Sequence, residues 1–235
     1  MITTILLDSD GTLYDEKSAK TVAEKDVSTY IAQASGISFG EVHNAYLSSK
    51  KTVLASYQDT PERNDRELWY RELLSHLDLL DLKDLSPKDL CSMYWDIVLE
   101  NIKPYEDVIK ILPELSEKYD LWVLTDESQD IQIRKLTKLG IHGYLKGVIS
   151  SDQTGHLKPR KSVFEYALNQ TGSKKESTAM IGDNPKRDIR GANNTGLVSI
   201  FIRRGKYSDD HLEGDNRPNY IIDDYSELLS VLSKI

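Results

Sequence analysis

The sequence predicts an α/β protein, in which a Rossmann-like, doubly wound parallel sheet carries an inserted all-helical domain. Two observations support this prediction. Short apolar runs alternate with amphipathic stretches from residue 103 onward, a pattern typical of parallel strands that helices cover on both faces. Residues 16–102, which follow the first apolar run, show helical spacing instead. We therefore expect an α/β core over residues 1–15 and 103–235, with an all-helical insert over residues 16–102.

The strands and helices of the core follow from these runs. Residues 3–7 form the first apolar, β-rich run, and it stops at a cluster of Asp, Gly and Thr, as strands often do. Further strands are predicted at residues 121–124, 147–150, 178–181, 198–202 and 220–222. Amphipathic stretches predict helices at residues 108–115, 128–139, 162–170, 185–196 and 225–232. The polar, turn-rich residues 205–218 predict a surface loop.

Apolar residues of the insert recur at helical spacing and predict about four helices. One stripe contains Leu90, Met93, Tyr94, Ile97 and Val98. Ser86 and Pro87 precede it, and this pair is typical of a helix start because serine caps and proline fits the first turn. A second stripe contains Trp69, Leu73, Leu77 and Leu80.

Composition narrows the classes of partner. The 235 residues carry a formal net charge of -8, which disfavours binding to nucleic acid or to an anionic membrane. Cys91 is the single cysteine, so neither an intrachain disulfide nor a thiolate metal cluster can form. The apolar run Ile5–Leu7 is too short for a signal peptide or a membrane span. We expect a cytoplasmic protein, either a monomer or a homodimer.

Polar residues follow four of the predicted strands. Asp8 to Thr12 comes after the first strand, Thr125 after the second, Lys158 in the loop after the third, and Asp183 after the fourth, with Asp188 five positions later. Each alone has a common structural explanation, since Asp-Gly favours turns and aspartate caps helices. Ligands of open parallel sheets, however, bind at the carboxyl ends of the strands. The whole set therefore predicts one site at that edge.

This order of motifs resembles the haloacid dehalogenase superfamily, in the branch with a helical cap between the first and second motifs. The resemblance implies a phosphatase that hydrolyses small phosphorylated metabolites, which are phosphate monoesters. Asp8 would be the nucleophile that forms an aspartyl-phosphate intermediate. Asp10 would act first as the general acid for the leaving alcohol and then as the base for water.

The resemblance also implies a Mg²⁺ cofactor. Asp8, the main-chain carbonyl of Asp10 and Asp183 would hold the ion, since hard oxygen ligands suit it. Thr125 and Lys158 would contact the phosphoryl oxygens. Mg²⁺ and Lys158 would thereby supply locally the positive charge that an acidic chain needs to attract a phosphate.

The motifs contain three further residues of interest. Asp188 would orient Lys158 or a metal-bound water. Ser9 and Asp126 depart from residues that are frequent in the family, and Asp126 could tune access to the phosphate site.

Two alternative functions remain. One is a phosphomutase that uses the same aspartate pair, and the other is a non-catalytic regulatory protein on the same scaffold. A dehalogenase is disfavoured because that chemistry uses no acid at position 10.

Overall fold

The computed structural model describes residues 1–204, 207 and 211–235. The chain divides into two compact units. The first, here called the core unit, consists of Met1–Glu16 and Lys103–Ile235. The second, here called the helical unit, is Lys17–Ile102. No helix in the described part of the chain has the length and apolar character needed to cross a lipid bilayer.

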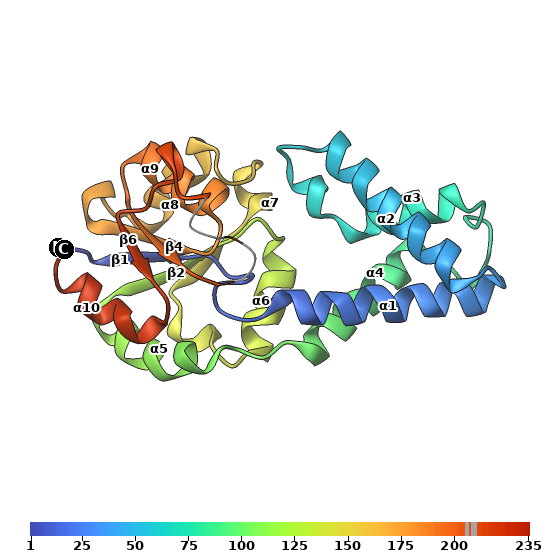
Figure 1. Cartoon of the computed structure of the whole chain (residues 1–235), viewed down its shortest axis with the longest axis horizontal. Coiled ribbons are helices and arrows are strands. Elements are labelled where there is room, and N and C mark those ends of the chain that lie inside the picture. Colours follow the sequence, from blue (N-terminus) through green and yellow to red (C-terminus); the bar gives the residue numbers. More distant parts are fainter. Residues whose placement is uncertain (205–206, 208–210) are drawn as a thin grey trace. The chain divides into compact units, whose positions relative to one another are not determined.

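A parallel sheet forms the centre of the core unit (Figure 1). Its described strands are β1 (Thr4–Leu7), β2 (Asp120–Leu124), β3 (Gly147–Ile149), β4 (Thr178–Gly182), β5 (Val198–Ile202) and β6 (Tyr220–Ile222). They pair in the order β3-β2-β1-β4-β5-β6. The chain builds outward from β1 to β3 and then returns to the other side of β1, so the topological switch point lies between β1 and β4. The predicted fold class is confirmed.

Helices cover both faces of this sheet, with α8 and α9 on one side and α5 and α10 on the other (Figure 1). The α-helices of the described core unit are α5 (Glu106–Lys118), α6 (Gln129–Lys138), α7 (Ser151–Thr154), α8 (Lys161–Thr171), α9 (Arg190–Thr195) and α10 (Leu228–Leu232). Short 3₁₀ turns lie at His142–Tyr144, Lys175–Ser177, Gly214–Asn216 and Tyr225–Glu227. The surface loop predicted over residues 205–218 lies partly outside the described residues.

The helix predicted over residues 185–196 consists of two parts. A π-helical turn, η4 (Pro185–Ile189), comes before α9. The Asn184 side chain caps the turn by accepting hydrogen bonds from the backbone N–H groups of Lys186 and Arg187. Asp188 lies within this turn, where its side chain is fully buried and its Oδ2 atom accepts a hydrogen bond from the Asn184 backbone N–H at 3.1 Å.

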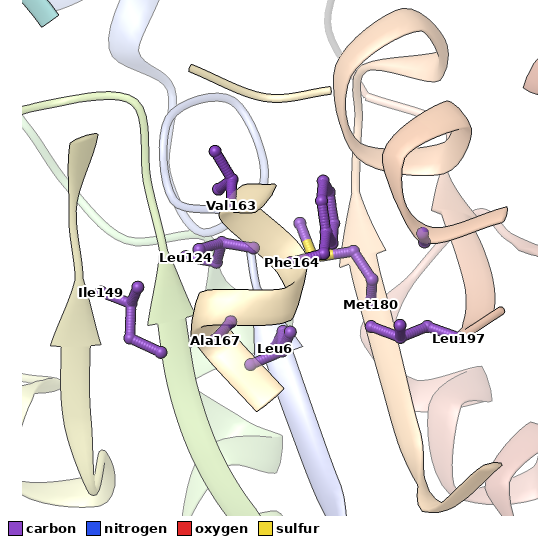
Figure 2. Packing of buried hydrophobic residues seen from close by; sticks show 9 residues of the cluster. Leu6, Leu124, Ile149, Val163, Phe164, Ala167, Met180 and Leu197 are labelled. Carbon is purple, nitrogen blue, oxygen red and sulfur yellow. The ribbon is translucent and has the colours of Figure 1, made fainter. Parts of the chain in front are cut away.

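An apolar cluster beneath α8 holds this helix on the sheet (Figure 2). The fully buried members from the sheet include Leu6, Leu124 and Met180, which come from three adjacent strands. Phe164 and Ala167 of α8 pack against them. Because strands of a parallel sheet are buried on both faces, their runs are continuously apolar, which is the signal that predicted them.

The helical unit has all of its residues described. Its α-helices are α1 (Glu16–Ser35, whose first residue belongs to the core unit), α2 (Phe39–Ser56), α3 (Arg66–His76) and α4 (Pro87–Asn101), with a 3₁₀ turn at Pro61–Asn64. Ser86 caps α4 as predicted, because its hydroxyl accepts from the Asp89 N–H at 3.4 Å. The unit has a core of its own, in which buried aromatic rings contact one another: Tyr46, Trp69, Tyr70, Tyr94 and Trp95.

One predicted stripe of the insert is wrong at its end. The helix α3 ends at His76, and Leu80 is 50% exposed. The chain leaves the helix because Leu77 is the C-cap and Asp78 follows with a φ of 56°. A left-handed residue ends helical spacing, so Leu80 no longer shares a face with Trp69.

Candidate active site

The nucleophile candidate Asp8 lies at the carboxyl end of β1, beside the topological switch point. Its backbone N–H donates to the Ile181 carbonyl of β4 at 2.9 Å, which extends the sheet pairing by one residue. The Thr12 hydroxyl donates to Asp8 Oδ2 at 3.1 Å and accepts from the Asp183 N–H at 3.1 Å. Thr12 therefore joins the ends of β1 and β4 and fixes one oxygen of the Asp8 carboxylate.

Lys158 contacts the other oxygen of the Asp8 carboxylate. Its Nζ atom lies 2.6 Å from Asp8 Oδ1 and 2.7 Å from Asp188 Oδ1, and it donates to the Leu124 carbonyl at 3.0 Å. Burial by itself would lower the pKa of the Lys158 ammonium, but the charges of Asp188, Asp8 and then Asp126 outweigh it and raise that pKa. The lysine is therefore a permanent positive charge next to Asp8. The peptide bond between Lys158 and Pro159 is cis.

Three carboxylates gather at this edge of the sheet. Asp8, Asp183 and Asp188 each offer an oxygen, and these oxygens lie within 4.8 Å of one another. Burial, followed by the charges of Asp8 and Asp188, raises the pKa of Asp183. Burial and the charge of Asp8 likewise raise the pKa of Asp188, although Lys158 opposes this. Like charges this close are unfavourable unless a cation joins them, and carboxylate oxygens suit a hard divalent ion.

Two glycines let the backbone approach these carboxylates. Gly11 has a φ of +83°, and a Cβ atom there would lie 2.8 Å from Asp183 Oδ2. The peptide that carries the predicted Asp10 carbonyl ligand is thus close to Asp183. At Gly182 a Cβ atom would lie 2.3 Å from Asp188 Oδ2. Side chains at either position would displace a carboxylate of the cluster.

The side chain of Asp10 turns to other partners. Lys135 Nζ donates to Asp10 Oδ1 at 2.9 Å and to Oδ2 at 3.0 Å, and the Tyr14 hydroxyl also donates to Oδ1. The Asp10 side chain keeps 21% of its surface exposed. It is therefore more accessible than the Asp8 side chain, which keeps 12% exposed, and an accessible carboxylate can exchange protons with a substrate and with water.

Thr125 joins the site through a glutamine. Its hydroxyl donates to Gln132 Oε1 at 3.3 Å and accepts from the Glu127 N–H at 3.1 Å. Gln132 Nε2 donates in turn to the Ser9 hydroxyl at 2.6 Å. The structure thus connects Thr125 to the loop that carries Asp8. Its predicted contact with a phosphoryl oxygen remains a prediction.

Sequence reasoning missed Lys135 and Gln132, the two polar residues on the buried face of α6. The buried positions of this helix are Gln132, Lys135 and Leu136, and Leu139 continues the same face. A lysine and a glutamine inside an apolar stripe were the available signal, because buried polar groups need specific partners. Their partners lie more than a hundred positions away in the sequence and could not be read from it.

Asp126 has a structural role that the sequence did not reveal. Its Oδ1 accepts from the Lys158 backbone N–H at 2.8 Å, and its Oδ2 pairs with Arg187 Nη1 at 3.1 Å. The hydrogen bond from the Lys158 N–H fixes the loop that carries Lys158. The ion pair with Arg187 connects Asp126 to η4. Asp126 therefore joins the segments that follow β2, β3 and β4.

The fold and these contacts agree with the comparison to known proteins. The family model described as haloacid dehalogenase-like hydrolase matches residues 5–202. The chain belongs to this family. The family prediction is therefore confirmed, and the match includes every residue that the sequence nominated for the site.

Curated relatives of the family align along the whole chain. A glyceraldehyde 3-phosphate phosphatase of Methanopyrus kandleri is 31% identical over 100% of this chain and 99% of the relative. A second one, from Methanocaldococcus jannaschii, is 30% identical over 100% of this chain and 99% of the relative. A ribulose-1,5-bisphosphate 5-phosphatase of Halopiger xanaduensis is 28% identical over 99% of this chain and all of the relative.

Solved structures of the family share the architecture. A HAD phosphatase from Thermococcus onnurineus is 26% identical, with a TM-score of 0.72 and 98% of both chains covered. A 2-haloacid dehalogenase from Pseudomonas syringae superposes with a TM-score of 0.77, covering 100% of this chain and 99% of the other. Its identity is 22%, so this second likeness concerns the fold alone.

Proposed function

We propose that the protein is a Mg²⁺-dependent phosphatase of small phosphorylated metabolites, which uses Asp8 as its nucleophile. One observation carries the proposal. The buried Asp8 carboxylate is held between Lys158 and Thr12, and the Asp183 and Asp188 carboxylates lie beside it. This arrangement combines an oriented nucleophile, a fixed positive charge and oxygen ligands for a divalent ion at the carboxyl edge of the sheet.

The first half of the reaction transfers the phosphoryl group to the protein. A carboxylate oxygen of Asp8 attacks phosphorus, and the bond from phosphorus to the ester oxygen breaks. Asp10 donates a proton to that oxygen, so the alcohol leaves neutral. Lys158 stabilises charge on the phosphoryl oxygens, with Thr125 as a second donor.

The second half restores the enzyme. Asp10, now a carboxylate, removes a proton from a water molecule that attacks phosphorus. The bond between phosphorus and Asp8 breaks, which releases inorganic phosphate and restores the Asp8 carboxylate, while the proton taken from water leaves Asp10 protonated again. Asp8, Asp183 and the Asp10 carbonyl would hold Mg²⁺, whose charge offsets that of the phosphoryl group. Asp188 would keep Lys158 in place, since the two side chains lie 2.7 Å apart.

The proposed substrate class is small phosphorylated metabolites, and the proposed role of the helical unit is that of a cap. The names of the relatives support the substrate class, because they refer to phosphatases of a triose phosphate and of a sugar bisphosphate. The position of the helical unit in the chain supports the cap role. It is inserted between β1 and the rest of the core, and it has its own buried core. Caps of this kind exclude water and select the leaving group.

Phosphate release from a panel of esters tests the proposal. The panel comprises glyceraldehyde 3-phosphate, ribulose 1,5-bisphosphate, glycerol phosphate and 4-nitrophenyl phosphate, each with Mg²⁺ or with EDTA. We expect Mg²⁺-dependent release by the wild type and release at the buffer background by Asp8→Asn. A matched control is Asp130→Asn, which changes an exposed aspartate of α6 and should leave the rate unchanged.

The panel also separates the alternatives. A folded Asp8→Asn variant that still hydrolyses esters at an appreciable fraction of the wild-type rate would exclude the nucleophile assignment. A phosphomutase would convert a sugar phosphate to its isomer with little free phosphate, most clearly with a bisphosphate activator present. A regulatory protein would release no phosphate from any ester.

A further inference from the structure

Lys135 is a fully buried lysine outside the predicted site motifs. Its side chain has 0% relative exposure, and it projects from the buried face of α6. An ammonium group is expensive to bury unless opposite charge and hydrogen bonds compensate it. The compensation here comes from Asp10, because Nζ contacts both carboxylate oxygens at 2.9 and 3.0 Å. A two-point contact restricts rotation of a carboxylate more than a single hydrogen bond does.

Tyr14 adds a third contact to the same carboxylate. Its hydroxyl donates to Asp10 Oδ1, and its ring lies 5.9 Å from Lys135 Nζ. Burial, reinforced by the Asp10 charge, raises the pKa of Tyr14, so its hydroxyl stays a donor. Bridges to Asp10 and Pro104 hold the Tyr14 backbone. The tyrosine is therefore held at its backbone and contacts the same carboxylate oxygen as Lys135.

One face of α6 contacts two successive residues of the loop that follows Asp8, namely Ser9 and Asp10. Gln132, one turn before Lys135, contacts Ser9 and Thr125, and Lys135 contacts Asp10. Residues three positions apart lie on the same side of a helix. A helix packed on the sheet positions side chains more accurately than a loop can, and proton transfer depends on such accuracy.

We propose that Lys135, assisted by Tyr14, is a positioning residue that fixes the Asp10 side chain for its two proton transfers. The inference rests on the function proposed above. Lys135 itself does not touch the substrate in this scheme and acts through Asp10 alone. Its removal should leave substrate binding intact and slow the steps in which Asp10 gives or takes a proton.

Two substrates with different leaving groups test this role in Lys135→Met. With 4-nitrophenyl phosphate, the first turnover should still release a stoichiometric burst of 4-nitrophenol, because that leaving group departs without a proton. Steady-state turnover, which needs Asp10 to activate water, should fall by about 100-fold, the typical effect of a misplaced catalytic group. With glycerol phosphate both phases should slow. For 4-nitrophenyl phosphate, kcat/KM should change by less than about twofold, because it reports only the steps up to release of 4-nitrophenol. KM itself should fall together with the steady-state rate, because the phosphorylated enzyme accumulates.

The control is Lys138→Met, which makes the same change at an exposed position of α6 and should behave like the wild type.

A double-mutant cycle provides the decisive comparison. If Lys135 acts through Asp10, adding Lys135→Met to Asp10→Ala should slow neither phase further. Equal loss of burst and steady state in Lys135→Met, or an additional loss in the double mutant, would overturn the inference.

Tyr14→Phe keeps the ring and removes only the hydroxyl, so it tests the same clamp if Lys135→Met does not fold. Its steady-state rate should fall while its burst remains, and a wild-type steady state would contradict the proposal. A wild type without turnover would refute the proposed function and this inference together. An active wild type with an unaffected folded Lys135→Met would refute the inference alone.

Discussion

At the scale of single residues, the carboxylates around Lys158 contact different parts of that lysine. Asp8, the proposed nucleophile, forms one ion pair with the Lys158 ammonium. Asp188 forms a second ion pair with the same ammonium. Asp126 contacts the backbone of Lys158 instead and pairs with Arg187. A lysine fixed at both its backbone and its ammonium has little freedom, so its charge stays where a phosphoryl group would need it.

The Asp126 contact leads to a stability prediction. Asp126→Ala should lower the free energy of unfolding by about 1–3 kcal/mol, because it leaves the N–H of buried Lys158 without its acceptor. Asp126→Asn should lose less, since an amide oxygen can still accept from that N–H. Urea unfolding measures both. Asp152→Ala is the control: Asp152 also accepts from a backbone N–H, that of Gln129, but at an exposed position. Equal losses in the two alanine variants would contradict the role of Asp126.

At the scale of elements, the site depends on how closely helices approach one another and the sheet. The end of β4 carries Asp183, and the chain continues through η4 into α9. Helix α9 then packs on α8, where Phe164 lies against Gly191. A Cβ atom at position 191 would lie 2.0 Å from Phe164 Cε2. The absence of a side chain there lets the two helices meet, so the segment after β4 is held against the sheet.

This packing predicts that Gly191→Ala destabilises the core unit by about 1–3 kcal/mol, because the methyl group must displace the Phe164 ring or the helix. The matched control is Gly143→Ala, since a Cβ atom at position 143 meets nothing within 4 Å. We expect that control to be close to neutral. Chemical denaturation followed by circular dichroism compares the two variants. A stable Gly191→Ala variant would show that the two helices can separate without cost.

At the scale of the whole molecule, an acidic protein must attract a phosphate by local means. The chain has a formal net charge of -8, and three of its carboxylates gather at the site. Burial and mutual repulsion destabilise this cluster, as the raised pKa of Asp183 shows. A divalent ion would relieve that repulsion. Because the ligands sit on two neighbouring strands and the following turns, the site exists only in the folded chain.

Mg²⁺ should therefore stabilise the fold. At a concentration about 100-fold above its Kd, the melting temperature should rise by about 5–10 °C. Without metal, Asp183→Asn should melt higher than the wild type, because one charge of the cluster is gone, and Mg²⁺ should raise its melting temperature little. Differential scanning calorimetry measures both. KCl at equal ionic strength controls for general screening, and an equal response to KCl and MgCl₂ would argue against a specific site.

Local sequence patterns were sufficient for the fold class and for most elements. Continuous apolar runs marked the strands because a parallel sheet is buried on both faces. The pattern failed at Leu80, where a left-handed residue ended α3 after His76. Nor did it separate the π-helical turn η4 from α9, since both share the same amphipathic character. Backbone geometry at helix ends depends on single residues, which periodicity averages out.

By itself, the sequence determined that Asp8, Thr125, Lys158 and Asp183 each come after a different strand, because the apolar runs that precede them are recognisable. Only the tertiary structure decided which side chains meet. The buried pairing of Lys135 with Asp10 requires a particular strand order and a particular rotation of α6 on the sheet. Neither is written in local spacing, since a polar residue in an apolar stripe shows that a partner is needed without showing which one.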